Sequence, residues 1–432
     1  MISEGDRPLR VVVVNKSDST GGAAVVSRRL MYALRSIGVD ARMLVAEKLT
    51  DSPYVEVCAP PFKIKKEFLL ERGKIFLANG FDRSTLFKID TGEEGLPLWQ
   101  HHLVEEADAV LINWINQGML SLKGISKILK RGVPVIWTMH DMWCMTGLCH
   151  HAGTCTRYHG KCGDCPLLGS RKSAGDLSAK VWQDKRDLYT SGMASNLRFV
   201  AVSNWLRDRC GESTLLKSHK VEVIPNPFPI EETALHRMEG DKDEVRILFG
   251  AARLDDAVKG FPTLIELTRT LRDRYRAIAS RLHLVTFGNI KDTTLLDSLA
   301  IRHTHLGMIY GEEKIRKLYQ DSHILVSCSS YETLPGTLVE AQAYGCIPVS
   351  FDQGGQRDII QHKSTGWLSK YNGDATLGAA SLAEGVAWAI SQIDEVSAHN
   401  AIIDKMRRNV EESFEAGIIA SRYLQLIDSM IS

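Results

Sequence analysis

The stretch SYETLPGTLVEAQAYG, residues 330–345, decides the fold of this chain. It follows an apolar run, His323–Cys328, which is typical of a buried parallel strand. A helix is predicted from about Thr337 and should end at Gly345, because glycine commonly terminates helices. Apolar residues 347–350 predict another strand. The stretch therefore predicts a strand–loop–helix–strand unit of an open α/β sheet.

Two carboxylates lie within this unit. Glu332 follows the predicted strand at its carboxyl end, where open α/β sheets bind ligands. Glu340 lies on the predicted helix, whose N-terminus and preceding loop amides favour an anion. Together these groups suit a ligand that carries hydroxyls and a phosphate. The alternative is that Glu332 is an ordinary loop residue and Glu340 a solvated helix residue.

The same stretch resembles the Glu-x7-Glu signature of the retaining glycosyltransferases of family 4, the largest group with the two-domain GT-B fold. The resemblance continues into Gly354-Gly355 and into residues 365–368, TGWL. It implies an α/β protein with two Rossmann-like doubly wound domains facing a cleft. It also implies a C-terminal helix that crosses back to the N-terminal domain.

The chain length of 432 residues argues for about two domains. By the resemblance, residues 1–228 form an acceptor-binding domain with a cysteine-rich insertion at 144–170. Residues 229–412 form a nucleotide-sugar-binding domain, and 413–432 form the returning helix. The apolar pattern of 410–431 predicts helical structure at this end.

The composition is that of an ordinary globular protein, with 44% hydrophobic and 24% charged residues. A net charge of +1 gives no indication of general nucleic-acid binding. No apolar run reaches the roughly 18 residues that a membrane-spanning helix needs. Residues 1–6 are polar and acidic, unlike a signal peptide. We therefore expect a cytoplasmic protein.

The N-terminal segment predicts a β-loop-α-β unit. The expected elements are a strand at 10–15, a helix at 23–37 and a strand at 40–45. Gly21 and Gly22 precede the helix and would let the backbone approach a ligand. The full G-x-G-x-x-G pattern is absent, which counts against a nicotinamide enzyme. The loop resembles the glycine-rich loop that faces the cleft in GT-B enzymes.

A His-Asp pair follows the predicted strand at 133–138. His140 would lie at the carboxyl end of that strand, a usual place for a binding site. It could donate a hydrogen bond to a sugar hydroxyl or stabilise positive charge nearby. The alternative is a structural histidine with satisfied hydrogen bonds. The resemblance implies that His140 contacts the donor sugar.

Nine cysteines are present, and five of them fall between residues 144 and 165. In a cytosolic chain such a cluster indicates metal binding or buried thiols rather than disulfides. The candidate ligands of a tetrahedral structural zinc site are Cys149, Cys155, Cys162 and Cys165. His150 or His159 could replace one of them. The alternative is a set of reduced thiols without metal. Similar insertions occur in a bacterial surface-polysaccharide branch of the family.

The segment 62–81 mixes lysines and arginines with phenylalanines, leucines and isoleucines. It predicts a helix with two alternative roles. It either lies on a membrane surface as a basic amphipathic helix or packs its apolar face into a domain core. Because many relatives act on lipid-linked acceptors, the resemblance favours peripheral contact with the inner face of the plasma membrane.

A second αβ set follows a polar connection predicted at 231–244. A strand at 245–252 leads to Arg253, and Lys259 precedes a helix at 262–275. Two cations at such a strand end could neutralise a departing diphosphate. The alternative is a solvated pair of charges. Arg253 and Lys259 resemble the family's diphosphate-binding pair in their relative spacing.

The resemblance implies a retaining hexosyltransferase. It would move a sugar from a UDP- or GDP-sugar to a hydroxyl of a glycan or lipid-linked glycan in bacterial polysaccharide biosynthesis. No catalytic metal is expected, because the cations supply the positive charge. The predicted catalytic residues are His140, Arg253, Lys259 and Glu332. The predicted donor-binding residues are Gly21, Gly22, Leu334, Pro335, Gly336, Thr337 and Glu340.

Two other functions remain open at this point. One is a nucleotide-sugar 2-epimerase on the same fold, which needs acid–base carboxylates and no acceptor. The other is a non-catalytic protein that binds a sugar nucleotide or a partner around the cysteine cluster. The complete set of phosphate-binding and Glu-x7-Glu residues favours the transferase.

Overall fold

The computed structural model describes residues 7–230, 244–371 and 373–431. The predicted connection at 231–244 lies outside the described residues except for Glu244. The chain divides into two compact units. The first comprises Met1–Pro227 and Ala416–Ser432, and the second comprises Phe228–Glu415.

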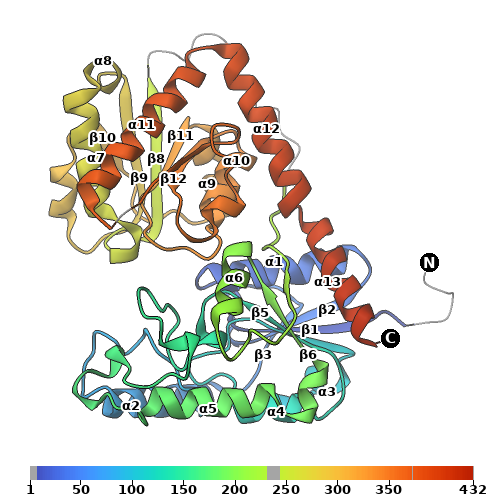
Figure 1. Cartoon of the computed structure of the whole chain (residues 1–432). Helices are drawn as coiled ribbons and strands as arrows, with labels where there is room; N and C mark the ends of the chain where they lie inside the picture. Colours follow the sequence, from blue (N-terminus) through green and yellow to red (C-terminus); the bar gives the residue numbers. More distant parts are fainter. Residues whose placement is uncertain (1–6, 231–243, 372, 432) are drawn as a thin grey trace. The chain divides into compact units, whose positions relative to one another are not determined.

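The first unit is built on a seven-stranded sheet with the strand order β3-β2-β1-β4-β5-β6-β7 (Figure 1). All of its neighbouring strands are parallel. The strands are β1 (Arg10–Ser17), β2 (Asp40–Glu47), β3 (Val55–Val57), β4 (Ala109–Ile112), β5 (Val135–Met139), β6 (Leu197–Ala201) and β7 (Val221–Val223). Parallel strands require crossover connections, and helices provide most of them here.

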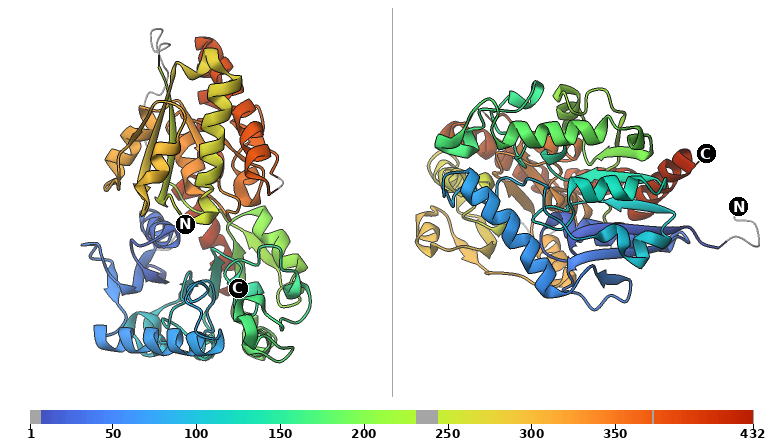
Figure 2. Two further views of the ribbon diagram at one scale, coloured as in Figure 1. Left: turned by 90° about the vertical axis from the view of Figure 1, so that its left-hand side faces the viewer. Right: turned by 90° about the horizontal axis from the view of Figure 1, so that it is seen from below.

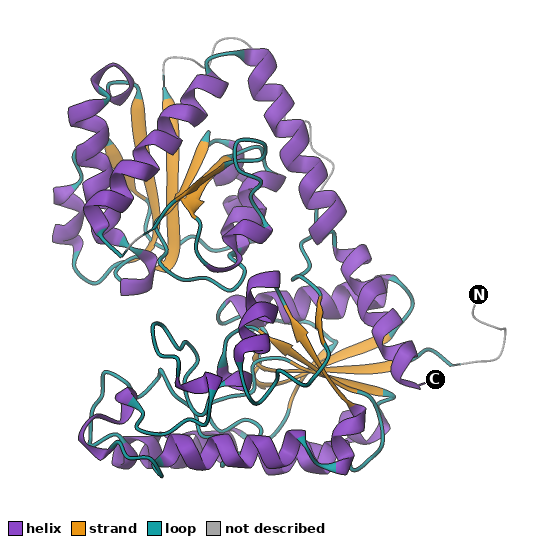
Figure 3. Cartoon of the chain, in the orientation of Figure 1, coloured by secondary structure: helices purple, strands orange, loops and turns teal. Residues whose placement is uncertain are grey.

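The α-helices of the first unit are α1 (Gly22–Ser36), α2 (Pro61–Ala78), α3 (His102–Glu106), α4 (Leu122–Leu129), α5 (Leu177–Tyr189), α6 (Asn204–Glu212) and α13 (Ala416–Ile431). Three of them, α1, α2 and α13, correspond to helices predicted in the sequence analysis. The segment between β5 and α5 is mainly loop with short helical turns (Figure 3). This is the predicted cysteine-rich insertion.

Helix α13 joins the core of the first unit. Its Ile419 and Ile427 are buried in the same cluster as strand residues such as Val13. The hydroxyl of buried Tyr423 lies 2.8 Å from the hydroxyl of Thr138 on β5. The prediction that the C-terminal helix returns to the N-terminal domain is confirmed.

The segment 410–431, which was predicted to be helical, is divided between two helices. Helix α12 (Val396–Phe414) ends at Glu415, whose φ of −58° and ψ of 136° are not helical. The Phe228 amide donates a 2.8 Å hydrogen bond to the Phe414 carbonyl, and Phe228 also forms a parallel bridge with Glu415. Pairing with this distant strand-like residue interrupts the helix.

The second unit has a six-stranded sheet of order β10-β9-β8-β11-β12-β13, again wholly parallel. Its strands are β8 (Val245–Arg253), β9 (Leu282–Asn289), β10 (His303–His305), β11 (Ile324–Ser327), β12 (Ile347–Phe351) and β13 (Trp367–Ser369). Its helices are α7 (Phe261–Arg274), α8 (Arg276–Ala279), α9 (Glu312–Gln320), α10 (Gly336–Ala343), α11 (Ala375–Ile393) and α12.

Helices α7 and α11 pack against each other over one face of this sheet (Figure 1). Ile247 and Val326 from the strands are buried with Leu264 of α7 and Leu382 of α11. The strand predicted at His323–Cys328 is β11, and the helix predicted from Thr337 is α10. The unit that opened the sequence analysis therefore has the expected form.

Helix α2 lies on the outside of the first unit (Figure 2). Its buried residues are Glu71, Arg72 and Ile75. By contrast, large apolar side chains are exposed, among them Phe62 and Leu69 at 69% and 54%. The helix therefore packs on the unit through Ile75 together with the polar residues Glu71 and Arg72, while part of its apolar surface stays exposed. Across the described residues, no helix combines the length and the apolarity of a membrane span.

Candidate functional site

Two loops of the second unit lie together at the carboxyl ends of β8 and β11. The Ser330 amide donates a 2.9 Å hydrogen bond to the Val258 carbonyl. Gly260 has a φ of 70°, and a Cβ there would collide with the Cys328 carbonyl. Glycine is therefore required where the loop before α7 crosses the loop after β11.

This crossing brings Lys259 and Glu332 into contact. The Lys259 Nζ lies 2.6 Å from the Glu332 Oε1, although 73 residues separate them in the sequence. Both side chains are half-buried, with exposed fractions of 32% and 20%. The structure thus places one predicted phosphate-binding cation directly beside the first carboxylate of the Glu-x7-Glu pattern.

The backbone of the Glu332 loop rests on Gly354 and Gly355. The Gly355 amide donates a 2.9 Å hydrogen bond to the Glu332 carbonyl. A Cβ on Gly354 would collide with the Glu332 carbonyl, and one on Gly355 with the Thr333 carbonyl. The double glycine therefore permits a close approach that holds the position of the Glu332 loop.

Helix α10 begins at Gly336, directly after this loop. Amides in the first turn of a helix have no intrahelical acceptor, so they can bind an anion. Glu340 lies one turn further along, and the Tyr319 hydroxyl donates a 3.3 Å hydrogen bond to its Oε2. The predicted loop residues Leu334 and Pro335 are buried, whereas Thr337 is half-buried.

Arg253 is the last residue of β8. Its side chain is 52% exposed, and its Nε lies 3.4 Å from Asp255 Oδ1. Among the described residues, no hydrogen bond or ion pair joins Arg253 to Lys259 or Glu332. The structure therefore brings Lys259 and Glu332 together and leaves Arg253 on the adjoining strand end.

The predicted residues of the first unit follow β1 and β5. Gly21 precedes α1 with a φ of 87°, and a Cβ on Gly21 or Gly22 would meet no atom within 4 Å. The backbone is therefore accessible here. His140 follows β5, and its Nε2 lies 2.9 Å from the Asn113 Oδ1. Burial lowers the pKa of His140 to about 4, so the imidazole is neutral at pH 7.

A buried ionic network next to His140 was not predicted. His150 Nδ1 lies 2.7 Å from Asp141 Oδ2, and His150 Nε2 lies 2.6 Å from Asp90 Oδ2. Asp90 also pairs with Arg72 of α2. Burial alone would lower the pKa of His150, but Asp141 and Asp90 offset it and raise the pKa to about 10. Asp90 is 60 residues from His150, so no local pattern reveals their contact.

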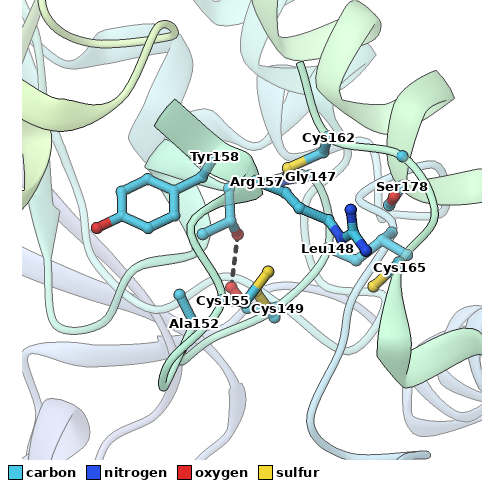
Figure 4. Close-up of a pocket in the computed structure, with 12 residues that line it drawn as sticks. Gly147, Leu148, Cys149, Ala152, Cys155, Arg157, Tyr158, Cys162, Cys165 and Ser178 are labelled. Carbon is cyan, nitrogen blue, oxygen red and sulfur yellow. Dashed lines mark hydrogen bonds between the residues drawn. The ribbon is translucent and has the colours of Figure 1, made fainter. Parts of the chain in front are cut away.

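These contacts bear on the choice of zinc ligands. Both ring nitrogens of His150 are engaged by carboxylates, so His150 is not available as the alternative metal ligand. His159 Nε2 lies 3.1 Å from Glu212 Oε2. The four candidate cysteines line one pocket of the insertion (Figure 4).

Glu71 on α2 gives a prediction about pH. Burial and the neighbouring Asp90 raise its pKa to about 7, although Arg72 opposes them. Its Oε1 accepts hydrogen bonds from the Thr91 and Gly92 amides at 2.9 and 3.1 Å. Its Oε2 has no hydrogen-bond partner in the described part of the chain. Glu71 is therefore better accommodated when it is protonated.

The folded-state pKa of Glu71 exceeds its ordinary value of 4.5, so its contribution to stability is complete below pH 4.5 and is lost as the pH rises through about 7. We expect the Glu71→Gln variant, which keeps the Oε1 acceptor, to lose less unfolding free energy than wild type over this interval. Urea unfolding of both proteins at several pH values between 4.5 and about 7 measures this loss of unfolding free energy. Identical pH profiles would contradict the assignment.

Comparison with known proteins places this geometry in context. Residues 232–402 match the family described as Glycosyl transferases group 1. A protein of Escherichia coli strain K12 named as a colanic acid biosynthesis glycosyl transferase, WcaC, is 23% identical over 233 residues. That alignment covers 54% of this chain and 55% of WcaC. The chain therefore spans about half the length of this curated relative.

Solved structures resemble nearly the whole chain. A glycosyltransferase from Rickettsia africae has a TM-score of 0.62 at 14% identity and covers 98% of this chain and 99% of its own. HepE from Anabaena, solved in complex with UDP and glucose, has a TM-score of 0.58 at 14% identity, with 98% and 100% coverage. The chain has the GT-B fold, as predicted. The residues of the group 1 glycosyltransferase match all fall within the bounds of the second unit.

Proposed function

We propose that this chain is a retaining glycosyltransferase that uses a nucleotide-diphosphate sugar. The observation that carries the proposal is the Lys259–Glu332 pair beside the start of α10, within the segment that matches the group 1 family. A cation, a carboxylate and a helix N-terminus meet there at the carboxyl ends of parallel strands. This combination suits a donor that carries both phosphate and hydroxyl groups.

The roles of the individual residues follow from their chemistry. Lys259 and Arg253 neutralise the diphosphate as the bond to the sugar breaks, and the first-turn amides of α10 bind a phosphate oxygen. Glu340 accepts hydrogen bonds from the ribose hydroxyls. Glu332 holds Lys259 in place and accepts a hydrogen bond from the sugar. The donor phosphate takes the proton of the attacking hydroxyl on the same face of the sugar.

The first unit takes the acceptor in this proposal. Neutral His140 and the accessible backbone at Gly21 and Gly22 are the groups of this unit that we assign to sugar recognition. The similarity to WcaC supports an acceptor that belongs to a bacterial polysaccharide, free or lipid-linked. HepE was solved with UDP, which makes uridine nucleotides the first donors to test, with guanosine nucleotides second.

Nucleotide titration tests the donor site. We expect calorimetry with UDP, GDP, ADP and NAD to show binding of one nucleoside diphosphate. Glu340→Ala should weaken that binding about 10-fold, because a charged hydrogen-bond acceptor contributes about 1.5–3 kcal/mol. The control Glu384→Ala removes an exposed carboxylate of α11 in the same unit and should bind as wild type does. Binding of none of the four ligands would refute the proposed function.

A lipid-linked acceptor would bring the protein to a membrane, and we propose that α2 makes that contact on the inner face of the plasma membrane. Its exposed surface combines basic and large apolar side chains, as interfacial helices do. The exposed basic and large apolar residues are Phe62, Lys63, Lys65, Lys66, Leu69, Leu70, Lys74 and Leu77. Basic residues near an anionic surface contribute about 1 kcal/mol each.

We expect the protein to sediment with phosphatidylglycerol-containing vesicles and not with pure phosphatidylcholine. Replacing Lys63, Lys65 and Lys66 with glutamate should abolish this binding, since three attractive charges become repulsive. The control replaces Lys314, Lys317 and Lys405, which are exposed in the second unit, with glutamate. Equal losses in both variants would mean that overall charge, and not α2, determines vesicle binding.

A further inference from the structure

We propose that Cys149, Cys155, Cys162 and Cys165 bind one Zn²⁺ in a tetrahedral thiolate site that stabilises the first unit. This inference is independent of the proposed transferase activity. The four side chains surround one pocket, which Gly147 and Ser178 also line (Figure 4). Its volume of about 20 Å³ can hold a single ion or water molecule. All four cysteines are free thiols in the structure.

The backbone around the ligands is held by hydrogen bonds. The Asp176 carboxylate caps α5 and also accepts a 2.8 Å hydrogen bond from the Cys165 amide. The Gly147 amide donates a 3.2 Å hydrogen bond to the Cys162 sulfur. Such bonds to ligand atoms orient them and stabilise negative charge on a metal-bound thiolate.

Gly147 fits closely between the ligand loop and α5. A Cβ on this residue would collide with the Ser178 carbonyl and would lie 3.0 Å from the Cys162 Cβ. No larger residue can occupy the position without displacing Cys162 or the start of α5. The local packing therefore fixes the distance between the Cys162 thiol and the helix that supports the insertion.

A buried cation beside the pocket is evidence that the four cysteines carry negative charge as thiolates. Lys185 of α5 is fully buried, and its Nζ donates to the carbonyls of Trp143, Thr146 and Gly147 at 2.6, 3.0 and 3.1 Å. No carboxylate among the described residues lies within ion-pair distance of it. A buried ammonium normally has a negative partner. Zn²⁺ with four thiolates carries a net charge of −2, which would supply the negative partner for Lys185. Gly147 connects the two, because its carbonyl accepts a hydrogen bond from Lys185 and its amide donates one to the Cys162 sulfur.

The thiols must move closer together to bind the ion. Zn–S bonds of about 2.3 Å place tetrahedral sulfurs about 3.8 Å apart. No three of these sulfurs lie within 4.8 Å of one another in the structure. Among the described residues, the single group of three possible metal ligands that meets this distance is Glu56, His101 and His102. The cysteines lie on loops or short turns, whose conformation can change when an ion binds. The exposed Arg157 side chain extends across the pocket in Figure 4 and can turn outward.

Metal analysis of the purified untagged protein tests the site. We expect one zinc per chain, and Cys162→Ser should lose it. The control His102→Ala should retain the zinc, because it removes a possible ligand only from the separate group of Glu56, His101 and His102. Cobalt substitution should give thiolate-to-cobalt charge-transfer absorption. Chelation should lower the melting temperature of wild type, because metal-binding energy is folding energy here.

A thiol titration covers the case in which Cys162→Ser fails to fold. Mercurial modification of wild type should release one zinc as four thiols react. Protein without zinc, whose melting is unchanged by added zinc or by chelation, would overturn the proposal. So would loss of zinc in His102→Ala alone, or disulfides among the four cysteines in freshly purified protein.

Discussion

Replacing Lys259 with alanine should reduce kcat by about 10²–10³-fold, the usual effect of losing one group that stabilises transition-state charge. Lys259 is predicted to neutralise the diphosphate, and the structure holds its ammonium against Glu332 at 2.6 Å. Because the pair is partly solvent-exposed, its loss should change the unfolding free energy by about 1 kcal/mol at most. A large loss of activity with little loss of stability is therefore the expected signature.

Glu332→Gln supplies the second arm of this experiment. It removes the charge that orients Lys259 while keeping a hydrogen-bonding side chain, so we expect a smaller loss of kcat than in Lys259→Ala. The double variant should be no worse than Lys259→Ala alone, since the two residues act as one unit. The control Lys405→Ala removes an exposed lysine of α12 and should be fully active. Full activity in both single variants would refute the site.

Asp90→Asn should cost about 3–5 kcal/mol of unfolding free energy, because it breaks a buried ion pair and leaves the partner uncompensated. Asp90 is 1% exposed and contacts Arg72 and His150, and its Oδ1 accepts a hydrogen bond from the Gln117 amide at 3.2 Å. With the negative charge removed, His150 would keep only Asp141 as a carboxylate partner among the described residues, and Arg72 only the 4.0 Å contact with Glu71.

Urea unfolding measures the effect, and Asp108→Asn is the matched control. Asp108 pairs with Arg7 at 2.7 Å, but the pair is more exposed, so its loss should cost about 1 kcal/mol or less. Equal destabilisation by the two substitutions would show that the network around Asp90 contributes no more than a surface pair. The result would then remove the reason to regard His150 as a charged structural residue.

Much of the fold could be predicted because the signals are local. Continuous apolar runs such as Val11–Val14 mark parallel strands, and every side chain from Val11 to Ser17 is buried in the structure. Glycines at helix starts and ends mark the turns between elements. The Glu-x7-Glu stretch then identified the fold, because its strand, loop and helix occur in one short segment. Its residue roles stay predictions until the variants are measured.

The tertiary structure decided which residues meet. Lys259 and Glu332 are 73 residues apart, and the contact arises because two glycines, Gly260 and Gly354, let their loops approach. The break before α13 depends on backbone pairing with Phe228, which no helical periodicity encodes.

The same distinction applies to α2 and to the cysteines. The sequence by itself predicted a helix of mixed basic and apolar residues at 62–81 and showed that four cysteines lie within one short segment. Only packing decided that α2 buries Glu71 and Arg72 against Thr91 and Asp90 and leaves Phe62 and its leucines exposed. The physical reason is that local sequence fixes a residue's periodicity, whereas burial and ion pairing depend on partners brought together by the whole chain.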